Sequence, residues 1–434
     1  MDTAGADRLK RPGPSRWARV LDRVWPGGAY VRLLWLLLVV SAGLRLTWLD
    51  QPDGALIFDE KYYVNSVRVI LGIAPKDEVY TNAELGRDPN IEHPPLAKLI
   101  VAGAVCLFGD QPYAWRVPSV LFGTLSILVL HALARSMGAD RTTALVAAFL
   151  LAFDNLVFVH SRICTLDVFQ LAFMLLGLYA YVLRRPFGAG AAFALAALCK
   201  IGGAFGLLAL AGYELLRVAR GREAWRTACH APIARLARTS IGFAVVFLVL
   251  LTLMDRVWGG IRTPLAHVRH MYTYGASLRH PNGPSGIQSR PWQWLWNHVE
   301  IPYSKVEQEV KIGDEVVERR TQVLFLGAMN PFVLQLWPLG LAFAAVSWWR
   351  RRPESDLSAL ALAWFALTLA PFFGASLFGQ RVTYLFYILP TLPAVALAGG
   401  VFLVKGGLPR AVLWGYLAAV LLGFYGYFPF KDVR

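Results

Sequence analysis

Long apolar runs, separated by short polar and basic segments, dominate the pattern of the chain. The first run covers residues 30–48 and is followed by a polar stretch. The next run, residues 96–108, is well short of the roughly 20 residues that a helix needs to cross a bilayer. We therefore expect it to form an interfacial helix within a long first external loop, residues 49–115. The repetition of such runs predicts an all-α polytopic membrane protein.

Basic residues between the apolar runs indicate how the predicted helices are oriented, because Lys and Arg gather on the cytoplasmic side. The basic segment 1–29 is placed inside, which puts the loop 49–115 outside. Continuing in this way predicts about 11 transmembrane helices in a single domain, residues 30–428. After the first helix, crossings are expected from 116 to 135, at 142–153, at 167–184, as two half-crossings within 187–216, at 241–254, before the WWRRR sequence, on either side of 379–381, and before the terminal KDVR.

The region 187–216 is predicted as two short segments because of the basic residues that follow it. A single helix there would move a basic block to the outside, namely Arg217, Arg220, Arg222, Arg226, Arg235 and Arg238. Two short segments that meet at 200–203 keep this block inside, and the pair Gly202-Gly203 is a plausible break. The polar segment 255–323 is then a second external loop.

The composition agrees with a membrane protein and excludes an ordinary soluble domain, since 56% of the 434 residues are hydrophobic and 16% are charged. The net charge of +15 comes from clusters between apolar runs, so we interpret it as a topology signal and expect no nucleic-acid partner. The four cysteines lack the spacing of a zinc site. No small-residue cleavage site follows the first run, which we expect to be a retained signal anchor.

Ionisable residues gather on the predicted external face. Such residues at membrane ends are costly to bury and are candidates for function. They are Asp59, Glu60, His93, Arg116, Asp154, Arg162, Asp167, Lys200 and Arg381. Their types suit the transfer of a sugar from a lipid phosphate to a hydroxyl, because a carboxylate can accept the hydroxyl proton and Arg or Lys can stabilise the departing phosphate. The chain has no DxD motif, and we expect neither a metal nor a cofactor.

Several motifs, in order along the chain, resemble the protein O-mannosyltransferase family. They are FDE at 58–60, EHPPLAK at 92–98, WRVPSVLFG at 115–123, DN at 154–155, SR at 161–162, LD at 166–167, CK followed by GG at 199–203, SRPWQW at 289–294 and RVTYLFYILPTLP at 381–393. The resemblance implies the GT-C glycosyltransferase fold and the transfer of mannose from dolichyl- or polyprenyl-phosphate-mannose to Ser or Thr of proteins.

The resemblance also implies roles for particular residues. Asp59 would be the catalytic base, Glu60 its neighbour in the acceptor site, and Arg116 a group near the donor phosphate. Lys200 and Arg381 are further candidates for the phosphate. The loop 255–323 is too short for the MIR domain of the eukaryotic enzymes, which indicates a bacterial form in the plasma membrane with its active site outside. Expected partners are a lipid-linked sugar, secreted or membrane proteins, membrane lipids and the protein-export machinery.

Some assignments have two interpretations from the residues alone. His93 belongs either to the site or to a rigid turn made by Pro94 and Pro95. Arg162 and Asp167 either pair with each other or contact the substrate. Trp292 is either part of an interfacial belt or a sugar-stacking residue.

The function has alternatives as well. Asp154 either binds the substrate or has a structural role. A related GT-C enzyme would transfer another lipid-linked sugar to a lipid or glycan. A transporter would also carry intramembrane charges, but it should show internal repeats, and none is evident.

Overall fold

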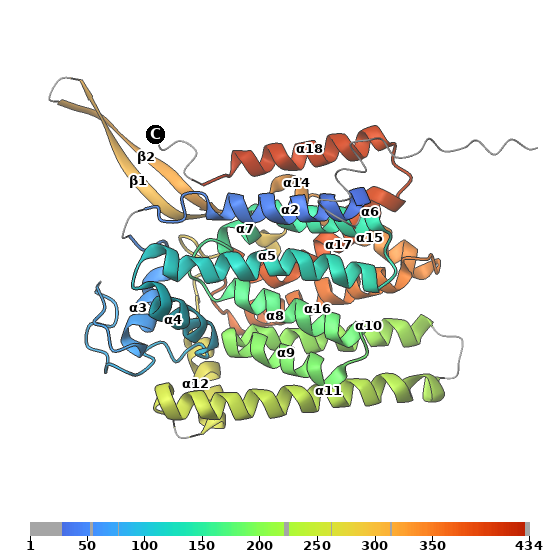
Figure 1. Cartoon of the computed structure of the whole chain (residues 1–434), viewed down its shortest axis with the longest axis horizontal. Coiled ribbons are helices and arrows are strands. Elements are labelled where there is room, and N and C mark those ends of the chain that lie inside the picture. Colours follow the sequence, from blue (N-terminus) through green and yellow to red (C-terminus); the bar gives the residue numbers. More distant parts are fainter. Residues whose placement is uncertain are drawn as a thin grey trace, which may run out of the picture.

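The computed structural model describes residues 28–52, 55–76, 78–220, 225–261, 263–312 and 315–429. Its long helices, among them α2, α5 and α11, form a bundle whose axes run roughly horizontally in Figure 1. Residues 1–27 of the predicted basic segment 1–29 lie outside the described part of the chain. The predicted first helix, 30–48, corresponds to α2, Gly28–Leu46.

Within the described residues, 7 helical segments are long and apolar enough to cross a membrane. Each consists of one helix or of two that follow directly: α2, α5 (Pro112–Ser136), η1 (Ile201–Ala204) with α10 (Phe205–Arg220), α11 (Trp225–Met254) with η2 (Asp255–Gly259), α14 (Pro331–Leu334) with α15 (Leu336–Trp349), α16 (Ser355–Gly379), and η3 (Leu385–Thr391) with α17 (Leu392–Lys405).

Shorter apolar helices complete the bundle: α4 (Leu96–Phe108), α6 (Arg141–Ala152), α8 (Asp167–Val182), α9 (Pro186–Cys199) and α18 (Arg410–Gly426). α4 has the bounds predicted for the interfacial helix and packs on α3 (Glu60–Ile70) and α5. The predicted count of 11 crossings stays a prediction.

The break expected at 200–203 is present. α9 ends at Cys199, Lys200 is extended, and one turn of 3-10 helix follows. A side chain at Gly203 could not be accommodated, since a Cβ there would lie 2.3 Å from the backbone carbon of Ala196. The glycine therefore allows the 3-10 turn to pack closely against α9.

The segment 255–323, predicted to be an external loop, contains helices and strands. It begins with η2 and α12 (Pro264–Ser277), continues through α13 (Pro291–Trp294), and enters an antiparallel hairpin of β1 (Ile301–Ile312) and β2 (Glu315–Gly327). The hairpin projects away from the bundle at upper left in Figure 1. The predicted helical fold class is confirmed, and this hairpin is a local addition that the prediction did not include; its Val, Ile and Tyr residues, interspersed with polar ones, suit a strand.

Candidate active site

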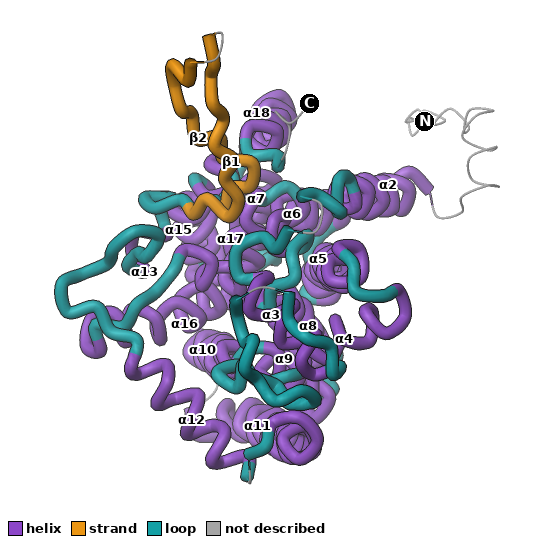
Figure 2. The backbone as a smooth tube through the Cα atoms, turned by 90° about the vertical axis from the view of Figure 1, so that its left-hand side faces the viewer, coloured by secondary structure: helices purple, strands orange, loops and turns teal. Residues whose placement is uncertain are grey.

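A cleft of about 1120 Å³ opens at the end of the bundle that carries α3, α4 and α12. Figure 2 looks onto this end, where loops and α12 lie around α3. Four of the predicted site residues line the cleft: Asp59, His93, Lys200 and Arg381. They come from four separate parts of the chain, so folding is what brings them together.

Asp59 lies at the start of α3 and faces the cleft. It occupies the N-cap position, but its side chain makes no capping hydrogen bond, so the carboxylate is not committed to the helix. Burial raises the pKa of Asp59 from 3.8 to about 6, against the opposing effect of the Lys200 charge. A carboxylate with this pKa is well suited to accept a proton near neutral pH.

Lys200 reaches the cleft from the break between α9 and α10. Its Nζ donates to Oδ1 of Asp167 at 2.7 Å and lies over the rings of Phe386 and Tyr387, at 4.9 and 5.0 Å from their centroids. Asp167, which begins α8, is buried behind Lys200 and does not line the cleft. Asp167 is therefore the anionic partner of Lys200, whose side chain faces the cleft.

Arg381 follows α16 and is held by its backbone. Val382 donates its N–H to the Leu278 carbonyl at 3.0 Å, and Arg381 forms an isolated β-bridge with Arg279, which also lines the cleft. The Nε of Arg381 is buried and has no hydrogen-bond partner in the described part of the chain. This guanidinium group is thus available to an anion.

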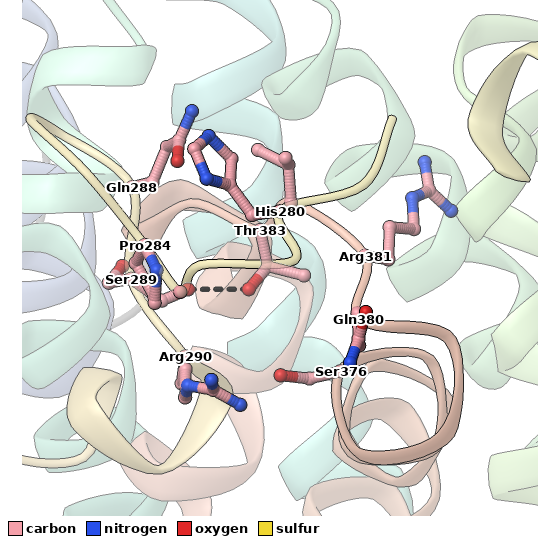
Figure 3. A pocket seen from close by; sticks show the side chains of 11 residues that line it. His280, Pro284, Gln288, Ser289, Arg290, Ser376, Gln380, Arg381 and Thr383 are labelled. Atoms are coloured by element: carbon pink, nitrogen blue, oxygen red, sulfur yellow. Dashed lines mark hydrogen bonds between the residues drawn. The ribbon is translucent and has the colours of Figure 1, made fainter. Parts of the chain in front are cut away.

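The wall beside Arg381 is closed by a second backbone contact. The Thr383 hydroxyl donates to the Ser289 carbonyl, and the Ser289 N–H donates to the Thr383 carbonyl at 2.9 Å. In Figure 3 the Arg381 side chain points away from this contact. The small cavity here has a volume of about 10 Å³, roughly room for one water. The contact fixes the segment that carries Arg381.

His93 lies in the cleft wall and is neutral. Its pKa is lowered well below 6.5, first by burial and then by the charge of Lys200, and its buried Nδ1 has no partner among the described residues. The turn that carries it is fixed by Lys98, whose Nζ donates to the His93 carbonyl at 3.0 Å and pairs with Asp88 at 2.5 Å. Both interpretations of His93 therefore have support: it faces the cleft, and it lies in a rigid turn.

Glu60 and Arg116 do not line the cleft. They form a buried ion pair in which Arg116 donates from Nη2 and Nε to the two carboxylate oxygens at 2.7 and 2.9 Å. Arg116 also donates to three backbone carbonyls, those of Leu49, Gln51 and Ala55. All five N–H groups of a guanidinium are thereby engaged. In this arrangement no donor of Arg116 is left for a ligand, and its predicted phosphate role stays a prediction.

Glu60 is equally committed to the protein. Besides Arg116, its carboxylate accepts the backbone N–H groups of Ile57 and Cys164 at 2.8 and 2.9 Å. It therefore joins the loop before α3 to the segment before α8. This buried position does not support direct contact between Glu60 and an acceptor.

Three other predicted residues lie elsewhere. Arg162 donates to the carbonyls of Thr47 and Trp48, so the suggested pair between Arg162 and Asp167 is not formed. Asp154 caps α7 (Asn155–His160) by accepting the N–H of Val157, which is a structural role. Trp292 packs on Phe373 at 6.1 Å and does not line the cleft.

Aromatic residues make up much of the cleft wall, and none of them was predicted as a site residue. They are Phe58, Tyr62, Tyr63, Tyr80, Tyr272, Tyr274, Tyr384, Phe386 and Tyr387. Phe58 lies in the FDE motif, and Tyr384, Phe386 and Tyr387 lie in the motif at 381–393, so their position in those motifs was the available signal. Rings of this kind suit a sugar or an apolar chain. Within the described residues, no group of three or more His, Cys, Asp or Glu side chains is arranged as a metal site.

Comparison with known families matches residues 92–255 to the family described as dolichyl-phosphate-mannose-protein mannosyltransferase. The resemblance to protein O-mannosyltransferases is thereby confirmed in this part of the chain. A polyprenol-phosphate-mannose--protein mannosyltransferase of Corynebacterium glutamicum is 29% identical over 176 residues, and one of Mycobacterium tuberculosis is 28% identical over 165 residues. The aligned parts cover 39% and 38% of this chain, and only 32% and 30% of those relatives' own lengths.

Solved structures match over nearly the whole chain. The yeast protein O-mannosyltransferase Pmt1-Pmt2 complex, bound to the sugar donor, superposes with a TM-score of 0.67 at 13% identity, covering 96% of this chain and 92% of that one. ArnT from Cupriavidus metallidurans, bound to undecaprenyl phosphate, gives 0.53 at 19% identity, covering 89% and 61%. At these identities the likeness concerns the fold alone. The chain is a multi-pass membrane protein with the predicted GT-C fold.

Proposed function

We propose that the chain transfers mannose from polyprenyl-phosphate-mannose to Ser or Thr hydroxyls of secreted or membrane proteins. The transfer takes place at the external face of a bacterial plasma membrane and inverts the anomeric centre. One observation carries the proposal: a carboxylate with a raised pKa, Asp59, shares a cleft with the cations Lys200 and Arg381. The family match over residues 92–255 and the names of the relatives support mannose and a protein acceptor.

The charges of the cleft suit this chemistry. The basic residues that line it are Lys61, Lys200, Arg279 and Arg381, against the acidic residues Asp59 and Glu92. An excess of cations favours an anionic ligand, and a phosphate monoester formed as a leaving group gains charge as the bond to the sugar breaks. Cations placed in advance at that position stabilise the transition state more than the ground state.

The reaction needs one displacement. Asp59 takes the proton of the acceptor hydroxyl as its oxygen attacks the anomeric carbon, and the carrier phosphate leaves toward Lys200 and Arg381. Because the attack and the departure occur on opposite sides of the carbon, the product has the inverted configuration. Glu60 and Arg116 act behind this site, where their ion pair fixes the start of α3 and with it the position of Asp59.

The direct test uses the purified full chain in lipid nanodiscs with radiolabelled polyprenyl-phosphate-mannose and a Ser/Thr-containing acceptor peptide. We expect label on the peptide, and none when GDP-mannose replaces the lipid donor or when the Asp59→Asn variant is used. Label on a lipid or glycan acceptor, with none on the peptide, would instead identify a related GT-C sugar transferase. We also propose that the export machinery delivers the acceptor. Co-purification of this machinery with the chain from membranes would test that step.

A further inference from the structure

Tyr303 enters the bundle from the base of the external hairpin. The register of β1 and β2 shifts between Pro302 and Ser304, so Tyr303 lies in a bulge of the ladder. Bulges redirect a side chain out of the ordinary alternation. Tyr303 is 5% exposed, although the hairpin to which it belongs projects from the protein. Its ring is directed inward, toward the elements that carry the cleft residues.

The ring of Tyr303 covers the residue next to Asp59. It stacks on Phe58 with centroids 4.2 Å apart and an angle of 17° between the planes. Phe58 has φ of 54°, a left-handed conformation that a bulky residue adopts only when its surroundings hold it there. Phe386 packs on the Phe58 ring edge-on at 5.7 Å. The direction in which Asp59 leaves the backbone therefore depends on this stack.

The hydroxyl of Tyr303 contacts a second residue, His160. It is hydrogen-bonded to Nε2 of His160 at 2.8 Å. Nδ1 of the same ring lies 3.8 Å from the carboxylate of Asp167, which is the partner of Lys200. Tyr303 thus contacts both Phe58, which precedes Asp59, and His160. The His160 ring in turn lies beside Asp167, the partner of Lys200.

The hairpin provides space for this ring at one position. Gly327, the last residue of β2, lies against it, and a Cβ at Gly327 would be 2.4 Å from Cζ of Tyr303. The φ of Gly327 is not in the left-handed region, so alanine is compatible with its backbone and would act by displacing the ring. The glycine gives a way to disturb Tyr303 without mutating it.

We propose that Tyr303 is a positioning residue of the transfer site, which sets the relative placement of Asp59 and of the Lys200 and Asp167 pair. The inference rests on the proposed function, in which Asp59 is the base and Lys200 a phosphate cation. Tyr303 acts through Phe58 and His160 and does not line the cleft itself. The base of the hairpin thereby has a role in catalysis, at a distance from its projecting end.

The test compares Tyr303→Leu, Tyr303→Phe and Gly327→Ala with the control Tyr427→Phe. The control also removes a tyrosine hydroxyl near the hairpin, one that donates to Glu300 at 2.9 Å, but it leaves the stack on Phe58 intact. Two readouts are needed: the pH dependence of mannosyl transfer, and the pH dependence with which a carbodiimide labels Asp59, followed by peptide mass spectrometry. The second readout requires no activity.

The pH readout reports the surroundings of one carboxyl. The charged and titratable groups that act on Asp59, or on which it acts, are Lys200, Asp167, Lys61, Tyr63, Tyr303, Tyr384 and Tyr387. All but Tyr303 are retained in each variant. A leucine at 303 removes the stacked ring, so water reaches Asp59 and its pKa falls from about 6 toward 3.8.

For Tyr303→Leu and Gly327→Ala we expect turnover to fall by about 10²-fold, because a misplacement of a reacting group by about 1 Å can reduce the rate by that much. The acidic limb of the rate profile and the labelling midpoint should both move to lower pH. Tyr303→Phe keeps the ring, so the acidic limb of its rate profile should stay at the wild-type pH and its rate should fall only a few-fold. A Tyr303→Leu variant whose limb and midpoint match those of wild type and Tyr427→Phe would overturn the proposal.

A wild-type protein that transfers no mannose would refute the proposed function without deciding the role of Tyr303. The labelling midpoint then decides that role: a shift in Tyr303→Leu supports positioning, and an unchanged midpoint refutes it. Thermal unfolding of each variant establishes that the compared samples are folded.

Discussion

Replacing Arg116 by leucine should damage the fold of the loop around Asp59 far more than it damages the binding of a lipid phosphate. The guanidinium group is 1% exposed, and the carboxylate of Glu60 that it contacts is 0% exposed. All of its donors are used within the protein. Arg116→Leu leaves the Glu60 carboxylate buried with only two backbone N–H groups as partners.

The expected magnitude follows from that uncompensated charge. Breaking a buried ion pair by removing one partner costs about 3–5 kcal/mol of folding free energy. The double variant Glu60→Gln/Arg116→Leu removes both charges, so its loss should be smaller than the sum of the two single losses. Arg116→Lys should not restore stability, since one ammonium cannot reproduce the forked contacts and the carbonyl contacts together.

The assay combines unfolding in mixed micelles with donor binding by the folded fraction. A control is Arg68→Leu, which removes a buried arginine of α3 that is paired with Asp110 at 3.1 Å and lies outside the cleft lining. Both variants should lose stability, Arg116→Leu by more, and neither should lose donor affinity once folded. An Arg116→Leu protein as stable as wild type but with weakened donor binding would refute this reasoning and restore the phosphate role.

Four further outcomes are expected. Asp59→Asn should lower turnover by about 10²–10⁴-fold with donor binding retained, and wild-type turnover should decline below about pH 6, where Asp59 becomes protonated; a pH-independent rate would contradict this. Lys200→Ala and Arg381→Ala should each cost about 10²-fold or more in rate with weaker donor binding, measured by single-turnover kinetics, whereas equal donor affinity would remove them from the phosphate site. Activity should survive EDTA, and a loss that a divalent ion restores would point to a metal. A cysteine in the loop 255–323 should react with an impermeant reagent from outside and one near Arg220 should not; the reverse pattern would overturn the orientation.

The pattern along the chain was enough to predict a helical membrane protein, the short helix α4 and the break after Cys199, because these depend on local runs of apolar residues and on glycine. It was also enough to name Asp59, His93, Lys200 and Arg381 as candidates, all of which line the cleft, since ionisable residues beside apolar helices are costly without a role. These features are properties of short stretches. They are visible without knowing which segments meet.

The partners of the charged residues were decided by the tertiary structure alone. From sequence, Arg162 and Asp167 looked like a pair because they are close along the chain, whereas folding brings Asp167 to Lys200 across 33 residues and Arg116 to Glu60 across 56. A buried charge takes the counter-charge nearest in space, and spatial neighbours between helices have no fixed spacing in sequence. For the same reason, Tyr303 could not be recognised as a neighbour of Phe58: its inward direction comes from a bulge in a hairpin that only the folded chain forms.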